Sequence, residues 1–118
     1  MDNYFQNLTR DINKNLEAFR KGQPDVMKGF GALAQAATAD GALDAKTKEL
    51  IALALGVGAR CDGCLGFHSK ALVKLGATME EVQETLAMAV YMGGGPSLMY
   101  ASNALAAFKE FSALQQAK

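Results

Sequence analysis

Apolar residues recur at spacings of three and four along most of the chain, and no stretch alternates apolar with polar residues as a half-buried strand does. Only two prolines interrupt the pattern. The sequence therefore predicts an all-α fold of six helices. Connections of about two to five residues favour antiparallel neighbours in a helical bundle.

Two helices are predicted in the first third of the chain, over residues 3–21 and from Pro24 to about residue 40. Gly22 is a natural stop for the first helix, and the missing N–H of Pro24 costs nothing in the first turn of the second. The first helix has an apolar face made of Leu8, Ile12, Leu16 and Phe19. The second has an apolar stripe that we expect to be buried, made of Val26, Phe30, Leu33, Ala34 and Ala37.

A third helix is predicted to follow Asp44, whose carboxylate can cap it, and to end near Gly58. Its second half has no polar face, because apolar residues follow one another there: Leu50, Ile51, Leu53, Ala54, Leu55 and Val57. A helix that is apolar all round has to be buried. It lies either at the centre of the bundle or partly under another subunit. Because residues 50–57 have more apolar surface than one small bundle can cover, we expect a multimer.

Three more helices complete the bundle. The fourth begins around residues 60–62 and ends at Gly76, and the fifth begins with a capping box of Thr78 and Glu81. The fifth has a core stripe made of Val82, Leu86, Ala89 and Val90. Residues 93–96, Gly-Gly-Gly-Pro, separate it from a sixth helix marked by Leu98, Ala101, Leu105 and Phe108. This glycine run lacks the Lys-Ser/Thr of a phosphate-binding loop, so we interpret it as a tight interhelical turn.

Length, composition and charge exclude several functions. The chain has 118 residues, half of them apolar, which predicts a single domain over residues 1–118. Twelve basic and twelve acidic residues balance, so neither nucleic acid nor a membrane surface is an expected partner. The longest apolar run, residues 51–59, is far shorter than the roughly 20 residues of a membrane-spanning helix. Residues 1–15 contain no secretory-signal pattern, and we expect a cytoplasmic protein.

The candidate chemistry lies between residues 60 and 68, which include Cys61, Cys64 and the single histidine, His68. At about 100° per residue these three side chains fall within roughly 60° of one another on one helix face. Two cysteines three residues apart can form a disulfide with little backbone movement. Because the positive end of the helix lies here, it should lower the thiol pKa below about 8.5 and favour the nucleophilic thiolate.

His68 and Glu49 are the candidate acid–base pair. His68 lies one turn beyond Cys64, roughly 6 Å along the axis, and can accept its proton directly or through a water. Glu49 lies early in the apolar third helix and shares a face with Ala52, Leu53 and Gly56. It either points inward and pairs with His68, which would strengthen the imidazole as a base, or is a solvated first-turn glutamate. The local pattern favours neither.

Two other interpretations of the cysteines stay open. They are packed residues of an Ala-rich helix, or, with His68, ligands of a metal. A structural zinc site needs four ligands, so Asp62 or Glu49 would have to complete it. We favour the redox-active pair and expect neither a metal nor a bound cofactor.

These residues resemble the AhpD-like, or alkylhydroperoxidase, branch of the carboxymuconolactone decarboxylase family. The resemblance rests on Glu49, on Cys61 twelve positions later, on Cys64 three further and on His68 four further. It covers about residues 39–107, the family core. It implies a six-helix AhpD-like bundle that assembles as a homotrimer or homohexamer, and thiol-dependent peroxide reduction and disulfide exchange without haem, flavin or metal.

The same resemblance implies a role for each residue. Cys64 attacks the peroxide oxygen, Cys61 resolves the sulfenic acid to a disulfide, and Glu49, His68 and a bridging water relay the proton. The substrate is then a small hydroperoxide or disulfide, and the partner is an unidentified dithiol reductant. The best-known alkylhydroperoxidases have a second histidine where this chain has Gly63, so peroxide reduction and disulfide exchange both remain as the main activity. The family also includes muconolactone decarboxylases, which as a rule lack the cysteine pair, and decarboxylation is the alternative chemistry.

Overall fold

Six α-helices account for most of the chain. The computed structural model describes residues 3–117, so the first two residues and the last one of the expected domain lie outside it. The helices are α1 (Tyr4–Gly22), α2 (Pro24–Thr38), α3 (Ala45–Gly58), α4 (Asp62–Lys74), α5 (Met79–Gly93) and α6 (Gly95–Gln116). The all-α, six-helix prediction is confirmed, and residues 3–117 contain no strand. No helix of this part of the chain is both long and apolar enough to cross a membrane.

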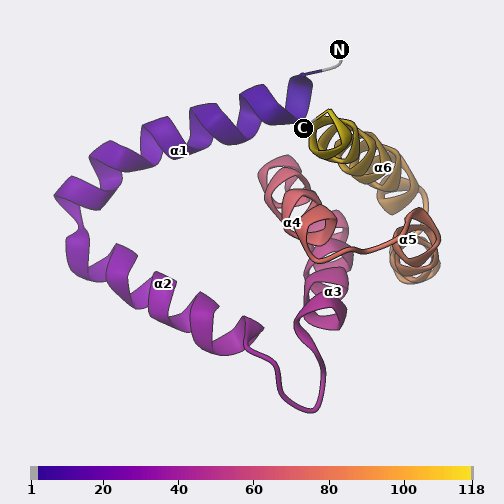
Figure 1. Cartoon of the computed structure of the whole chain (residues 1–118), viewed down its shortest axis with the longest axis horizontal. Helices are drawn as coiled ribbons and strands as arrows, with labels where there is room; N and C mark the ends of the chain where they lie inside the picture. The colour runs from indigo at the N-terminus through magenta and orange to yellow at the C-terminus, as the bar shows by residue number, and fades with distance from the viewer. Residues whose placement is uncertain (1–2, 118) are drawn as a thin grey trace.

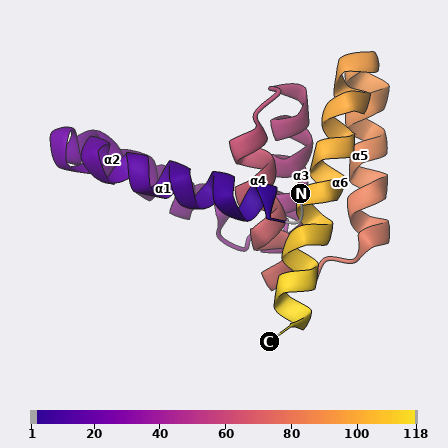
Figure 2. The ribbon, with the colours of Figure 1, turned by 90° about the horizontal axis from the view of Figure 1, so that it is seen from above.

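Helices α3 to α6 pack against one another, whereas α1 and α2 form an arm that extends to one side (Figures 1 and 2). The buried core comes from α3 to α6, with Phe5 contributed by the start of α1. Its largest fully buried side chains are Leu53, Leu65, Leu72, Val57 and Val82. Helix α4 lies between α3 and α6 and packs against both, so the residues of its first turn are held from two sides.

The predicted helix starts are confirmed at two positions. The Asp44 carboxylate accepts a hydrogen bond from the Thr47 N–H at 2.8 Å and caps α3. At the start of α5, the Thr78 hydroxyl accepts from the Glu81 N–H at 3.1 Å, and the Glu81 carboxylate accepts from the Thr78 N–H at 2.9 Å. Each bond satisfies a backbone donor that the helix itself leaves unpaired.

The start of α1 is capped by a residue far away in the sequence. Asn3 makes no side-chain cap. Instead, the Glu110 carboxylate of α6 accepts from the N–H groups of Phe5 at 3.1 Å and Gln6 at 2.7 Å. Both donors belong to the unpaired first turn, so one carboxylate satisfies two of them and fixes α1 to α6.

The apolar stripe of α2 is exposed, and the expectation that it is buried was wrong. Helix α2 has no buried residue, and Val26, Phe30 and Leu33 are 54%, 65% and 63% exposed. The cause lies in α1, which contacts the core near its start, through Phe5 and Thr9, and then carries the chain outward. Phe19, at the outer end of the predicted α1 face, is 48% exposed for the same reason.

Helix α3 is buried on one side only. Leu53, Gly56 and Val57 are buried, but Ile51 and Leu55 are 43% and 68% exposed. A central position, surrounded on all sides within one chain, is therefore excluded. The other explanation for its apolar second half is cover by another subunit.

Candidate functional site

A tight turn between α3 and α4 brings the cysteine segment against the end of α3. Arg60 has φ of 57°, in the left-handed region that is uncommon for residues other than glycine. The N–H of Cys61 bonds to the carbonyl of Gly56 at 3.0 Å, which folds the chain back over α3. A Cβ at Gly56 would lie 3.1 Å from the Cβ of Cys64, which is tighter than an ordinary van der Waals contact. The missing side chain at Gly56 thus favours the close approach of α3 to α4.

The two cysteines form a disulfide at the first turn of α4. Their Cα atoms are 5.2 Å apart, and both residues are partly buried. Cys61 is the N-cap residue, and its sulfur accepts a hydrogen bond from the Cys64 N–H at 3.1 Å. An amide that stabilises a sulfur at the positive end of a helix also favours the thiolate once the disulfide is reduced.

Glu49 and His68 form a pair that joins α3 to α4. The Oε1 atom of Glu49 lies 2.5 Å from the Nδ1 atom of His68, and the two side chains are 12% and 33% exposed. Of the two orientations that the sequence left open for Glu49, the structure has the inward one. An ionised carboxylate can only accept, so Nδ1 carries the proton of this bond and Nε2 is left to exchange protons with other groups.

The structure thus places all four candidate residues at the packed junction of α3 and α4. His68 follows Cys64 by one turn of the same helix, and Glu49 holds the imidazole from α3. Within residues 3–117, His68 makes no direct hydrogen bond to either cysteine, and its side-chain partner is Glu49. A proton relay to Cys64 therefore needs a bridging molecule such as water.

One contact of this region, between Asp62 and Asn103, was not predicted from the sequence. Asp62, the first residue of α4, accepts a hydrogen bond through Oδ1 from Nδ2 of Asn103 on α6, at 3.1 Å. The sequence signal was slight: a single asparagine in a helix whose neighbouring residues are mostly apolar or small. Sequence patterns do not show which helix α4 faces.

The metal interpretation finds no support in the geometry. Nowhere in the described part of the chain do three or more His, Cys, Asp or Glu side chains gather as metal ligands would. Asp62 bonds to Asn103 and Glu49 to His68, so both residues proposed to complete a zinc site have other partners.

Comparison with known proteins identifies the family. The family model for the carboxymuconolactone decarboxylase family matches residues 24–107. The chain belongs to the carboxymuconolactone decarboxylase family. A protein of Cupriavidus necator with no assigned function is 46% identical over 103 residues, which are 87% of this chain and 91% of the relative.

Solved structures of the carboxymuconolactone decarboxylase family have the same fold. A family protein from Legionella pneumophila is 65% identical, with a TM-score of 0.92 over 93% of this chain and 98% of the other. A family protein from Thermotoga maritima, described in connection with an antioxidative response, is 33% identical, with a TM-score of 0.72 over 78% of this chain and 95% of the other. The expected fold and family are confirmed, and the AhpD-like resemblance is consistent with them.

Gly63, between the two cysteines, faces α1. A Cβ on Gly63 would lie 2.9 Å from Cδ1 of Ile12. One turn later, a Cβ on Gly66 would lie 2.7 Å from Cγ2 of Thr9. Helix α1 therefore occupies the space beside Gly63, and a histidine there would have to displace Ile12.

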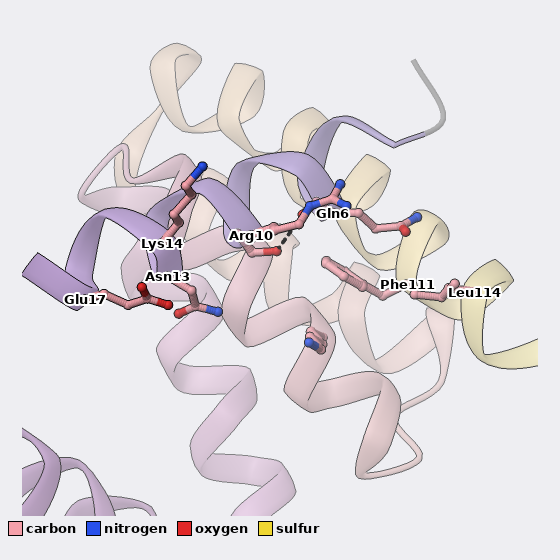
Figure 3. Close-up of a pocket in the computed structure, with 9 residues that line it drawn as sticks. Gln6, Arg10, Asn13, Lys14, Glu17, Phe111 and Leu114 are labelled. Carbon is pink, nitrogen blue, oxygen red and sulfur yellow. Dashed lines mark hydrogen bonds between the residues drawn. The ribbon is translucent and has the colours of Figure 1, made fainter.

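A groove of about 460 Å³ lies beside α1, away from the cysteines (Figure 3). Its charged residues are Arg10, Lys14, Glu17 and Lys70. Figure 3 shows the cationic ends of Arg10 and Lys14 diverging, and Glu17 offsets part of their charge. Since these groups do not converge on one point, we assign no ligand to the groove.

Proposed function

We propose that this family member is a thiol-dependent oxidoreductase that reduces hydroperoxides or exchanges disulfides through Cys61 and Cys64. The observation that carries the proposal is the disulfide at the first turn of α4, one turn before a histidine paired with a glutamate. This arrangement supplies the three requirements of dithiol chemistry: a second thiol within bonding distance, a stabilised thiolate and a base. The antioxidative connection of the Thermotoga maritima relative agrees with it.

The reaction begins with the reduced pair. His68, oriented by Glu49, accepts the Cys64 thiol proton through a water, and the thiolate attacks the distal oxygen of ROOH. The O–O bond breaks, Cys64 becomes a sulfenic acid, and the leaving alkoxide takes a proton to form ROH. The Cys61 thiol then gives up its proton and attacks the sulfenic sulfur, which forms the S–S bond and breaks the S–O bond, and the expelled hydroxide takes up that proton to leave as water. An external dithiol reduces this bond by two exchange steps and is itself oxidised to a disulfide.

Disulfide exchange uses the same atoms without a peroxide. This chain has Gly63 between its cysteines, so the Glu49–His68 pair is the acid–base machinery that supports both reactions. A reducing compartment, the cytoplasm in our proposal, would supply the external dithiol.

A free-thiol count before and after one equivalent of an organic hydroperoxide tests the proposal. The reduced, chelator-treated protein is compared with Cys61→Ser and Cys64→Ser variants. We expect rapid loss of both thiols in the parent and a trapped sulfenic acid only in the variant that keeps Cys64. If the thiols persist as long as those of an unfolded cysteine peptide, peroxide reduction is wrong, and exchange with small disulfides is tested next.

We also propose that the active form is a homo-oligomer, such as a trimer or hexamer. The single chain exposes two apolar surfaces: the α2 stripe, and a groove of about 530 Å³ between the ends of α3 and α5 and the start of α6. Within the groove, Leu55, Met88 and Met92 are 68%, 59% and 78% exposed. Exposed apolar patches of this kind mark interaction sites, and a second copy supplies a matching surface. A monomer in sedimentation at micromolar concentration would contradict this assignment.

A further inference from the structure

The hydrogen bond between Asp62 and Asn103 has no part in the proposed proton relay. Asp62 lies between the two cysteines in the sequence and is the first residue of α4. Its Oδ1 atom accepts from the Asn103 amide at 3.1 Å, and both residues are partly buried. The bond joins two residues that are 41 positions apart in the chain, so it fixes the first turn of α4 to α6.

When the disulfide is reduced, two negative groups lie near the start of α4: the Cys61 thiolate and the Asp62 carboxylate. Both are attracted to the backbone amides of the first turn. The Cys61 sulfur takes the Cys64 N–H, and the other amides of the first turn belong to Asp62 and Gly63. A carboxylate at the first position of a helix is attracted to these same donors. A carboxylate near them would repel a thiolate and weaken its stabilisation by the helix.

We propose that Asn103 is a positioning residue that holds the Asp62 carboxylate toward α6. The first-turn amides of α4 then remain available to the reduced Cys61 sulfur. The inference rests on the proposed dithiol function and adds a residue that tunes it. Asn103 suits this task because its neutral amide donates a hydrogen bond without adding a charge beside the thiols. Asn103 acts through Asp62 and touches neither sulfur in any bond that the described residues make.

The position of the Asp62 carboxylate affects two measurable quantities, the thiol pKa and the redox equilibrium of the cysteine pair. Loss of the Asn103 amide frees the carboxylate, so the lowest thiol pKa rises and the disulfide becomes harder to reduce. Loss of the Asp62 charge has the opposite effect on both. The other ionisable groups of this region, Arg60, Glu49 and His68, are the same in all variants.

A double-mutant cycle tests the inference with Asn103→Leu, Asp62→Asn and the combined variant. The thiol pKa is measured from the pH dependence of alkylation by iodoacetamide. The redox equilibrium, in which the protein disulfide and two glutathione molecules give the dithiol and glutathione disulfide, is measured in glutathione buffers. We expect Asn103→Leu to raise the thiol pKa by about half a unit to one unit, with a threefold to tenfold shift toward the disulfide.

The same Asn103→Leu substitution in the Asp62→Asn background is expected to leave the pKa unchanged, because no charge remains to be positioned. Equal shifts in the two backgrounds, or none in either, would overturn the inference. Asn103→Gln keeps the amide and should restore part of the parent values, which a purely structural role would not require. It also keeps the test usable if Asn103→Leu does not fold.

These measurements use no peroxide and no protein reductant. A parent that loses no thiols to a hydroperoxide but shows the expected cycle would contradict peroxide reduction and leave the role of Asn103 intact. If the parent protein reacts with peroxide but the double-mutant cycle shows no coupling, the role of Asn103 is contradicted and peroxide reduction is supported.

Discussion

Helices α2 and α5 are alike in sequence character and different in environment. Each has 15 residues, and each has an apolar stripe at helical spacing. In α5 the stripe is buried, with Val82, Leu86 and Ala89 in the core. In α2 no residue is buried, although its stripe contains larger side chains.

The difference lies in what each helix is attached to. Helix α5 is followed by a turn at Gly94, after which α6 packs back against α5, and α3 packs against both. Helix α2 follows α1, which leaves the core after its first turns. An amphipathic pattern therefore predicts that a helix has an apolar face, but the covering surface can belong to the same chain or to another one.

Truncation of one leucine in each helix gives the largest contrast. Leu86→Ala is expected to lower the free energy of unfolding by about 2–5 kcal/mol, because it leaves a cavity in the core. Leu33→Ala removes a side chain that is 63% exposed and should change the stability of the isolated chain by less than about 1 kcal/mol. Urea unfolding at low protein concentration measures both.

The dependence of stability on protein concentration distinguishes cover of α2 by its own chain from cover by another subunit. If α2 lies in a subunit interface, Leu33→Ala weakens the oligomer, and its stability falls further behind the parent as the concentration rises. If Leu33→Ala lowers the free energy of unfolding as much as Leu86→Ala does at every protein concentration, α2 packs within its own chain.

Glutamate-to-glutamine substitutions compare the packed α3–α4 junction with the extended arm. Glu49→Gln is expected to slow the reaction of the thiols with peroxide about ten- to a hundredfold at neutral pH, since a neutral amide orients and strengthens His68 less well. Glu17→Gln, on the exposed part of α1, should leave the rate unchanged. Stopped-flow measurement of thiol oxidation checks both, and an unchanged rate and thiol pKa in Glu49→Gln would rule out the relay.

Alanine at two glycines tests how closely α1 packs on α4. Gly66→Ala is expected to destabilise the fold by roughly 1–2 kcal/mol, because the new Cβ would lie 2.7 Å from Thr9 and this strain outweighs the gain in helix propensity. Gly29→Ala, in α2, meets nothing within 4 Å and should be neutral or stabilise by up to about 1 kcal/mol. Thermal unfolding distinguishes them, and a stabilised Gly66→Ala variant would show that α1 yields easily.

The smallest expected effect is a change in how the stability of the fold depends on pH. Hydrogen bonds from Lys46 and from the Thr78 backbone lower the pKa of Glu81 below its usual value of about 4.3. Ionised Glu81 therefore stabilises the folded state. This contribution is fully present above the usual glutamate pKa and is lost as the pH falls through the lower pKa that Glu81 has in the folded state. Glu81→Gln should therefore flatten the decline of stability below about pH 4.5. Urea midpoints between pH 2.5 and 6 measure the slopes.

Local chemistry was predictable from the sequence. The capping box of Thr78 and Glu81, the Asp44 cap and the cysteines at a helix start all depend on residues within a few positions of one another. Even the pairing of Glu49 with His68 was one of two stated options, because both residues lie in helices joined by a short turn.

Contacts between distant segments were not predictable. The bond from Asn103 to Asp62 and the cap that Glu110 provides for α1 depend on how α6 crosses the other helices. The exposed stripe of α2 has the same origin, since periodicity describes one helix and does not include its neighbours. The candidate dithiol and its base could therefore be predicted from a single sequence. The contact of Asn103 with Asp62, which holds the start of α4 against α6, could not.

The short span of the disulfide limits its contribution to the stability of the fold. Cys61 and Cys64 are three positions apart, so the bond closes a very small loop. In the chain-entropy account such a loop contributes roughly 2 kcal/mol, against about 4.7 kcal/mol for a loop of 100 residues. Opening and closing the bond thus changes the conformational freedom of the unfolded chain little. The redox cycle that we propose would therefore leave the stability of the fold nearly unchanged from one turnover to the next.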